Sequence, residues 1–110
     1  MDKFYALSEP KRREIIELLS VHGQLPATAI ARNFDVSTAA ISQHLKVLRE
    51  AGLVHVRKAG QRRIYQLNMA ALVELDTWVK QMTRSWNDRF DALDRVLKST
   101  KSEEDNHGNR

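Results

Sequence analysis

The sequence has no cysteine and no long apolar segment. The absence of cysteine excludes disulfide bonds, thiolate metal sites and cysteine nucleophiles, and it is typical of a reducing cytoplasm. No apolar run approaches the roughly 18 residues that a membrane-spanning helix needs. The first residues, Met1–Tyr5, do not have the charged-then-apolar order of a signal peptide. We therefore expect a soluble cytoplasmic protein without a membrane partner.

Enzymatic signatures are missing as well. The sequence shows no nucleophile–base pair, no glycine-rich phosphate loop and no cluster of metal ligands. Its histidines stand singly along the chain, at His22, His44, His55 and His107. A lone histidine in such places is more often a surface or packing residue than a ligand. The sequence therefore predicts neither an enzyme nor a bound cofactor or metal.

The basic residues are concentrated in the middle of the chain. With 18 Lys and Arg against 14 Asp and Glu, the formal net charge of the 110 residues is +4, and this length is typical of one domain. Between Val36 and Asn68 the only acidic residue is Glu50. The basic residues of the same segment are Lys46, Arg49, Arg57, Lys58, Arg62 and Arg63. This patch favours nucleic-acid binding, with a solvated basic surface as the alternative on charge alone.

Two short helices are predicted before this basic segment. Ser8 is suited to cap the first helix, with Pro10 in its first turn, and the helix extends to about Ser20. Gly23 ends the helix or lies just past it. The second helix spans about Pro26–Asn33, and a tight turn follows it.

A third helix is predicted from a Ser37 cap to about Ala51, where Gly52 stops it. Ile41, Leu45 and Leu48 recur at the spacing of one buried helical stripe. The remaining surface carries small and amide side chains instead of long charged ones, at Thr38, Ala39, Ser42, Gln43 and Lys46. The major groove of DNA admits such a helix, and amide, hydroxyl and small apolar groups contact its base edges.

The periodicity then changes to that of a β-hairpin. Leu53–Arg57 and Arg63–Leu67 alternate as strands do, and Lys58–Arg62 joins them through a glycine. The chain thus has two helices, a tight turn, a third helix whose exposed surface carries small side chains, and a basic hairpin. This order predicts a winged helix-turn-helix. If the side chains of Tyr65 and Leu67 face the core, alternation leaves Arg62 freer than Arg63.

A last, long helix is predicted over about 69–99, with Asn68 as its cap, followed by a disordered polar tail over 101–110. Its apolar residues recur mostly at alternating steps of three and four, as in a coiled-coil seam: Leu72, Leu75, Val79, Met82, Trp86, Phe90, Leu93 and Leu97. So small a domain cannot bury this seam, so we expect it to pair with a second copy. The expected dimer contacts are Phe4, Leu7, Leu72, Leu75, Trp78, Val79, Met82 and Trp86. For Trp78 and Trp86, lining an effector pocket is the alternative.

At this point the chain resembles the ArsR/SmtB-type winged-helix repressors. The residues that carry the resemblance are Ala6–Ile16, Val36–Leu48, Ala51–Val54 and Arg57–Leu67. The resemblance implies a cytoplasmic homodimer that binds a pseudo-palindromic operator in double-stranded DNA and represses transcription. In such proteins an effector, often a metal, releases the DNA.

The chain departs from the metal-sensing members of that family. Their thiolate site needs cysteines, and none is present. Their site on the C-terminal helix needs histidine together with carboxylates, and the predicted helix over 69–99 has no histidine. We therefore expect a member that does not sense metals, with a small-molecule effector left open.

The predicted DNA contacts lie on the third helix and the hairpin. They are Ser37, Thr38, Ala39, Ser42, Gln43, His44, Lys46, Lys58, Arg62 and Arg63. The Gln43 amide can pair with adenine, whereas His44, nearer the buried stripe, would either contact phosphate or pack. The hairpin cations would contact phosphate or the minor groove. Arg12 and Arg13 are further candidates for contacting the DNA backbone.

The predicted fold class is mainly α, a winged helix-turn-helix with a two-stranded wing and a long dimerisation helix. The domain covers 1–100, with the helix-turn-helix at 26–51 and the wing at 53–67. We expect a sequence-specific DNA-binding regulator that acts as a homodimeric repressor. A winged-helix module that binds another protein, or an activator, is the alternative.

Overall fold

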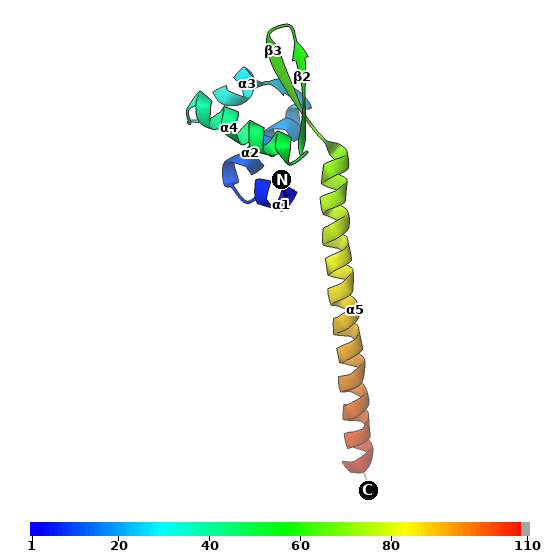
Figure 1. Cartoon of the computed structure of the whole chain (residues 1–110). Helices are drawn as coiled ribbons and strands as arrows, with labels where there is room; N and C mark the ends of the chain where they lie inside the picture. The colour runs from blue at the N-terminus through cyan, green and yellow to red at the C-terminus, as the bar shows by residue number, and fades with distance from the viewer. Residues whose placement is uncertain (109–110) are drawn as a thin grey trace. The chain divides into compact units, whose positions relative to one another are not determined.

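In the computed structural model, the backbone of residues 1–108 and the side chains of residues 1–100 are described. The chain divides into two units, Met1–Leu75 and Asp76–Arg110. The elements, all but β1 labelled in Figure 1, are α1 (Lys3–Ala6), α2 (Pro10–His22), β1 (Gln24–Pro26), α3 (Ala27–Arg32), α4 (Thr38–Glu50), β2 (Val54–Ala59), β3 (Arg62–Leu67) and α5 (Met69–Gly108). Among the described residues, none of these helices has the length and apolarity to cross a membrane.

The predicted fold class is confirmed, with one strand more than expected. β2 and β3 form the predicted hairpin, and β1 pairs antiparallel with the other edge of β3, placing Leu25 opposite Tyr65. The wing is therefore part of a three-stranded sheet whose middle strand is β3. With only three residues and a proline at its end, β1 is too short to show strand alternation in the sequence.

The start of α2 differs from the prediction. The cap is Glu9, whose side chain accepts a hydrogen bond from the backbone N–H of Arg12 at 3.1 Å. The hydroxyl of Ser8 donates instead to the carbonyl of Tyr5 at 2.6 Å and closes the turn after α1. Ser8 is thus occupied by a short helix that the sequence analysis did not predict, and the cap moves to the next residue.

Both predicted ends of α4 are confirmed. The Ser37 hydroxyl accepts a hydrogen bond from the N–H of Ala40 at 3.1 Å. At the other end Gly52 has φ of 77°, and the N–H groups of Gly52 and Leu53 donate to the carbonyls of Arg49 and Leu48. This paired arrangement satisfies carbonyls that the last turn would otherwise leave open, and glycine adopts the positive φ without strain.

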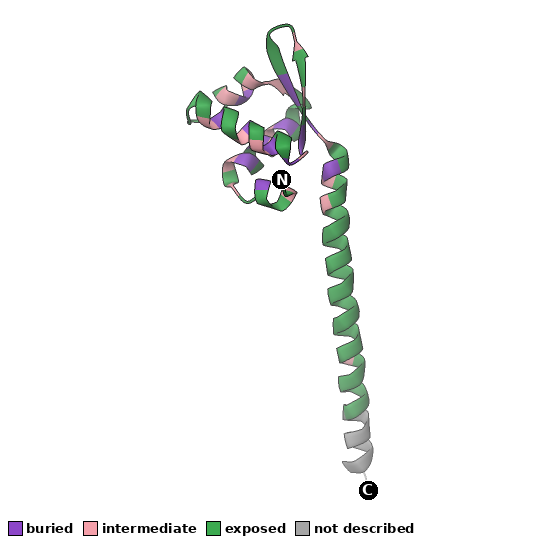
Figure 2. Cartoon of the chain, viewed as in Figure 1, coloured by how far each residue is buried: buried purple, intermediate pink, exposed green. Residues whose placement is uncertain are grey.

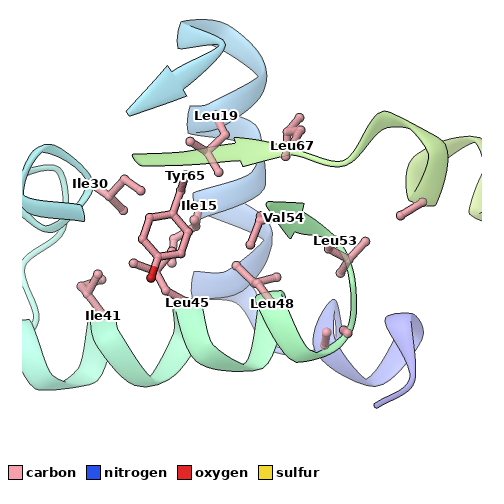
Figure 3. Close-up of a cluster of buried hydrophobic side chains, with 13 residues drawn as sticks. Ile15, Leu19, Ile30, Ile41, Leu45, Leu48, Leu53, Val54, Tyr65 and Leu67 are labelled. Atoms are coloured by element: carbon pink, nitrogen blue, oxygen red, sulfur yellow. The ribbon is translucent and has the colours of Figure 1, made fainter. Parts of the chain in front are cut away.

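The hydrophobic core of the first unit lies between α2, α4 and the sheet (Figure 3). Ile41, Leu45 and Leu48 have 1%, 1% and 0% of their surface exposed, as the helical spacing predicted. They pack with buried residues of the other elements, namely Ile15, Leu19, Ile30, Leu53, Val54, Tyr65 and Leu67. Because one stripe of α4 is held in this core, its remaining surface keeps a fixed orientation.

The first turns of α5 belong to the same core. Ala71 is buried, and Leu72 and Leu75 are half-buried against the cluster. Asn68, predicted to cap α5, has its side-chain amide donating to the carbonyl of Gly52 at 2.8 Å, and its own N–H bonds to Leu53. Asn68 therefore ties the beginning of α5 to the end of α4.

From residue 76 onward, the described side chains of α5 are almost all exposed (Figure 2). The helix does not end near Ser99, as expected, but continues to Gly108. The tail predicted over 101–110 thus begins within a helix. The side chains of 101–110, and residues 109–110 altogether, lie outside the described part of the chain.

Candidate nucleic-acid interface

The surface of α4 opposite its buried stripe is the first component of the candidate interface. Thr38, Ala39, Ser42, Gln43 and Lys46 are all exposed, as is the capping residue Ser37. The helix begins at Ser37 because the hydroxyl caps it, and the core then sets which of its side chains face outward. The exposed groups are three hydroxyls, one amide and one ammonium beside the small Ala39, which suits close approach to base edges.

A groove of about 560 Å³ lies beside this surface, between α4 and β3, and is called the wing groove here. From α4 it is lined by Ser42, Gln43, Lys46 and Arg49, and from β3 by Arg63 and Tyr65, together with Ala27, Ala39 and Leu45. Lys46, Arg49 and Arg63 are exposed, and within the described side chains none of the three forms a salt bridge. The groove therefore presents positive charge that no described side chain neutralises through a salt bridge, which favours an anionic partner.

The wing adds cations at its exposed end. Lys58 lies directly opposite Arg63 in the β2–β3 register, and Ala59 lies opposite Arg62. Like charges directly opposite each other destabilise a strand pair. The pair of Lys58 and Arg63 is therefore explained by an anionic ligand better than by stability.

Strand alternation did not distinguish the two arginines as expected. Tyr65 and Leu67 do face the core, but Ile64 is also buried, at 9% exposure. Arg62 and Arg63 are both exposed. Ile64 and Tyr65 are neighbours that point to opposite faces of β3, and both are buried, so alternation alone does not select Arg62.

The His44 side chain packs against α2, which is one of the two alternatives that the sequence left open. Its Nδ1 is 3.4 Å from Nη1 of Arg12, and its Nε2 is 3.9 Å from a carboxylate oxygen of Glu9. The side chain is 19% exposed. His44 therefore belongs to the helix contacts behind the candidate interface.

Arg12 and Arg13 are engaged with the protein's own backbone. Arg12 is buried, at 8% exposure, and its Nε donates to the carbonyl of Ala6 at 2.6 Å. The expectation that Arg12 contacts DNA is therefore wrong, because its guanidinium is used inside the fold. Arg13 is exposed, and its Nη1 donates to the carbonyl of Leu7 at 2.7 Å.

Arg49 is a candidate that sequence reasoning did not single out. It lies three residues after Lys46, so helical spacing alone could have placed it on the same surface. Its relation to Arg63 and Tyr65, which line the same groove, depends on how the sheet packs beside α4. No sequence pattern contains that information.

The predicted dimer residues divide into two groups. Leu72 and Leu75 are half-buried against their own core, and Leu7 is half-buried as well. The other predicted contacts are exposed: Phe4, Trp78, Val79, Met82 and Trp86, at 45% to 66%. On α5, Trp86, Arg89, Phe90 and Leu93 also line a hollow of about 280 Å³, so that the pocket and dimer alternatives for Trp86 both remain.

Outside the candidate interface, one ion pair on α5 changes the pKa of a side chain. On α5, Lys80 donates a hydrogen bond to the carboxylate of Asp76, and this bond, followed by the negative charge of Asp76, raises the pKa of Lys80. This ion pair is on the helix surface, one turn apart, with 2.8 Å between Nζ and Oδ2. In the described part of the chain, no group of three His, Asp or Glu side chains could hold a metal ion.

Proteins of similar sequence indicate the class to which this chain belongs. Residues 7–57 match the family model described as a helix-turn-helix domain. The chain is 46% identical over 83 residues to the HTH-type transcriptional regulator Rv2034 of Mycobacterium tuberculosis, across 71% of this chain and 77% of that protein. It is 37% identical over 76 residues to the transcriptional repressor SdpR of Bacillus subtilis, across 69% of this chain and 83% of that protein.

A solved structure agrees with the fold. The ArsR-like transcriptional regulator from Rhodococcus sp. RHA1 aligns with a TM-score of 0.76 at 30% identity, over 84% of this chain and 87% of that one. A helix-turn-helix followed by a basic hairpin defines a DNA-binding transcriptional regulator of the winged-helix class. The chain belongs to the ArsR/SmtB-type family of these regulators.

Proposed function

We propose that this regulator is a homodimeric repressor that binds a pseudo-palindromic operator through α4 and the wing. The observation that carries the proposal is the wing groove, where the small exposed surface of α4 adjoins Lys46, Arg49 and Arg63, three cations that form no salt bridge with a described side chain. Ser42 and Gln43 supply the hydrogen-bonding groups, and the cations supply contacts to phosphate. Repression follows when the bound dimer blocks the promoter.

The homodimer is supported by the exposed apolar residues of α5. Val79, Met82, Trp86, Phe90 and Leu93 keep 46% to 66% of their surface exposed. A contiguous apolar surface of this kind marks an interface, and two-fold pairing buries the same residues on both copies. Two wing–α4 surfaces related by a two-fold axis would then contact half-sites about one helical turn, or roughly 34 Å, apart.

The proposed repressor does not respond to metals. The sequence has no cysteine for a thiolate site, and the described residues of α5 offer no cluster of metal ligands. If an effector exists, it is a small molecule of another chemistry. Operator affinity is expected to be the same with Zn²⁺ or with a chelator; a drop in affinity at micromolar Zn²⁺ would contradict this part of the proposal.

Selection of bound sequences from a random DNA pool tests the function as a whole. A homodimeric reader is expected to enrich two inverted half-sites at constant spacing. Enrichment of a single half-site would contradict the dimeric mode. No enrichment would favour the alternative of a winged-helix module that binds another protein. A reporter gene placed behind the selected site separates repression from activation.

Replacing Gln43 with alanine is expected to relax the preference at one position of each half-site. The amide is exposed on the small surface of α4 and can pair with adenine. The expected cost is about 1–3 kcal/mol on the preferred sequence only. Affinities of Gln43→Ala are compared across duplexes with each base at each position, with Gln81→Ala on α5 as the control. Equal losses on preferred and random DNA would remove this role from Gln43.

Replacing Arg62 with alanine is expected to weaken binding to every sequence alike. Arg62 is exposed on the wing, next to the opposed cations Lys58 and Arg63. Loss of one phosphate contact lowers the slope of log affinity against log salt by about 1. The measurement is a salt titration of binding, with Arg84→Ala as a control that removes the same charge from α5. An unchanged slope would place Arg62 outside the interface.

A further inference from the structure

Arg12 connects three helices from a buried position. It lies on α2, and its guanidinium donates to two carbonyls of α1, from Nε to Ala6 at 2.6 Å and from Nη2 to Tyr5 at 3.4 Å. Its Cζ also lies 5.6 Å from the centre of the Tyr5 ring. Its third nitrogen, Nη1, faces Nδ1 of His44 on α4 at 3.4 Å. A buried cation is costly unless it is hydrogen-bonded, and here all three nitrogens have partners.

These contacts favour one tautomer of His44. A guanidinium only donates hydrogen bonds, so Nδ1 of His44 has to accept. The ring proton is then on Nε2, which faces a carboxylate oxygen of Glu9 at 3.9 Å. Glu9 in turn caps α2 through the N–H of Arg12. His44 is therefore oriented through Nδ1 by Arg12, and the Glu9 carboxylate lies near Nε2 but beyond hydrogen-bond distance.

We propose that Arg12 and His44 are positioning residues that set α4 against α1 and α2, so that Gln43 meets base edges correctly. The proposal rests on the proposed function, since it assumes that α4 contacts bases. His44 is the neighbour of Gln43 and is on the side of α4 that packs against the protein. A small rotation of α4 would misdirect the Gln43 amide, whereas long flexible cations such as Lys46 would still contact phosphate. Loss of the link therefore lowers sequence discrimination more than total affinity.

Two substitutions of the same shape test the link. His44→Leu removes the acceptor, whereas His44→Asn keeps a side-chain oxygen near the position of Nδ1, and leucine and asparagine have similar outlines. His22→Leu, at the exposed end of α2, is the matched control. Each full-length variant is titrated with the selected operator and with a duplex of the same length and scrambled sequence. Circular dichroism and thermal unfolding establish that each variant is folded.

The expected result is a loss of discrimination in one variant only. The ratio of operator affinity to scrambled affinity falls about tenfold in His44→Leu, the size expected for one lost hydrogen bond to a charged group. His44→Asn and His22→Leu keep the wild-type ratio. Equal losses on both duplexes in His44→Leu would assign His44 to a phosphate contact and overturn the proposal. A folded His44→Asn that loses as much as His44→Leu would overturn it as well.

A measurement without DNA separates this proposal from the proposed function. Side-chain ¹⁵N spectra of the wild-type protein are expected to show His44 with the proton on Nε2 and an unprotonated Nδ1, and Arg12→Met is expected to remove that preference. An Nδ1-protonated or freely exchanging His44 would overturn the link whatever the protein binds. If instead the wild type fails to prefer any operator while the tautomer is as expected, the proposed function fails, and the link remains as an internal contact of the fold.

Discussion

Replacing Leu48 with alanine is expected to lower the free energy of unfolding by about 3 kcal/mol. Leu48 is fully buried, and it closes the stripe by which α4 packs on the core beneath the sheet. Truncating a buried leucine removes the transfer free energy of three carbons and leaves a cavity, which together cost about 2–5 kcal/mol. A small domain is stable by only about 5–15 kcal/mol. The loss would therefore be a large fraction of the total.

Urea unfolding at one fixed protein concentration measures this change, because dimerisation would make stability depend on concentration. Val21→Ala is the control, since Val21 is 79% exposed on α2 and its truncation is expected to change stability by less than about 0.5 kcal/mol. A loss below about 1 kcal/mol for Leu48→Ala would contradict the packing of α4 described here.

Replacing Met82 with glutamate is expected to dissociate the proposed dimer and to reduce operator affinity by about a hundredfold. Met82 is 46% exposed in the single chain, in the middle of the apolar stripe of α5. In a two-fold pair each substitution would bury two carboxylates without partners, at several kcal/mol each. The monomers would then bind half-sites separately and lose the gain of simultaneous contact.

Sedimentation equilibrium measures the mass, and a gel-shift titration on the selected operator measures the affinity. Gln81→Glu is the control, because it adds the same charge one residue away and outside the apolar stripe, on an exposed part of α5. A Met82→Glu protein that keeps both the dimer mass and full operator affinity would rule out this stripe as the dimer interface.

The apolar residues of α5 recur every eleven residues, which differs from the seven-residue repeat of a coiled-coil seam. Leu75, Trp86 and Leu97 are separated by eleven residues, as are Val79 and Phe90, and Met82 and Leu93. An 11-residue repeat corresponds to about 3.67 residues per turn, and it favours a straight or slightly right-handed pair of helices over a left-handed coiled coil. The stripe therefore keeps one orientation along the exposed part of the helix.

Local sequence rules predicted the elements whose cause is local. The Ser37 cap, the Gly52 stop and the stripe of Ile41, Leu45 and Leu48 all follow from neighbours within one or two helical turns. The hairpin of β2 and β3 was predictable for the same reason. These features are enough to indicate a winged helix-turn-helix and the surface of α4 that is left exposed.

The wrong cap at Ser8 has a local cause in α1, but other features were missed because they depend on packing between separate elements. Arg12 looked like a surface cation because nothing nearby shows that α1 and α4 surround it. β1 forms because it pairs with the edge of β3 that β2 does not occupy. Arg49 and Arg63 line the same groove only because the sheet packs beside α4. None of these relations has a periodic signal.

By itself, then, the sequence determined the class of the protein, the buried stripe of α4 and the residues available for contacting DNA. Periodicity and capping depend on residues that are close together in the sequence, and the absence of cysteine follows from the composition. Only the tertiary structure decided that His44 faces Arg12 and that Lys46, Arg49 and Arg63 come together in the wing groove without a salt bridge to a described side chain. Each of these depends on which distant elements the core brings together, because the chain buries its apolar surface as a whole.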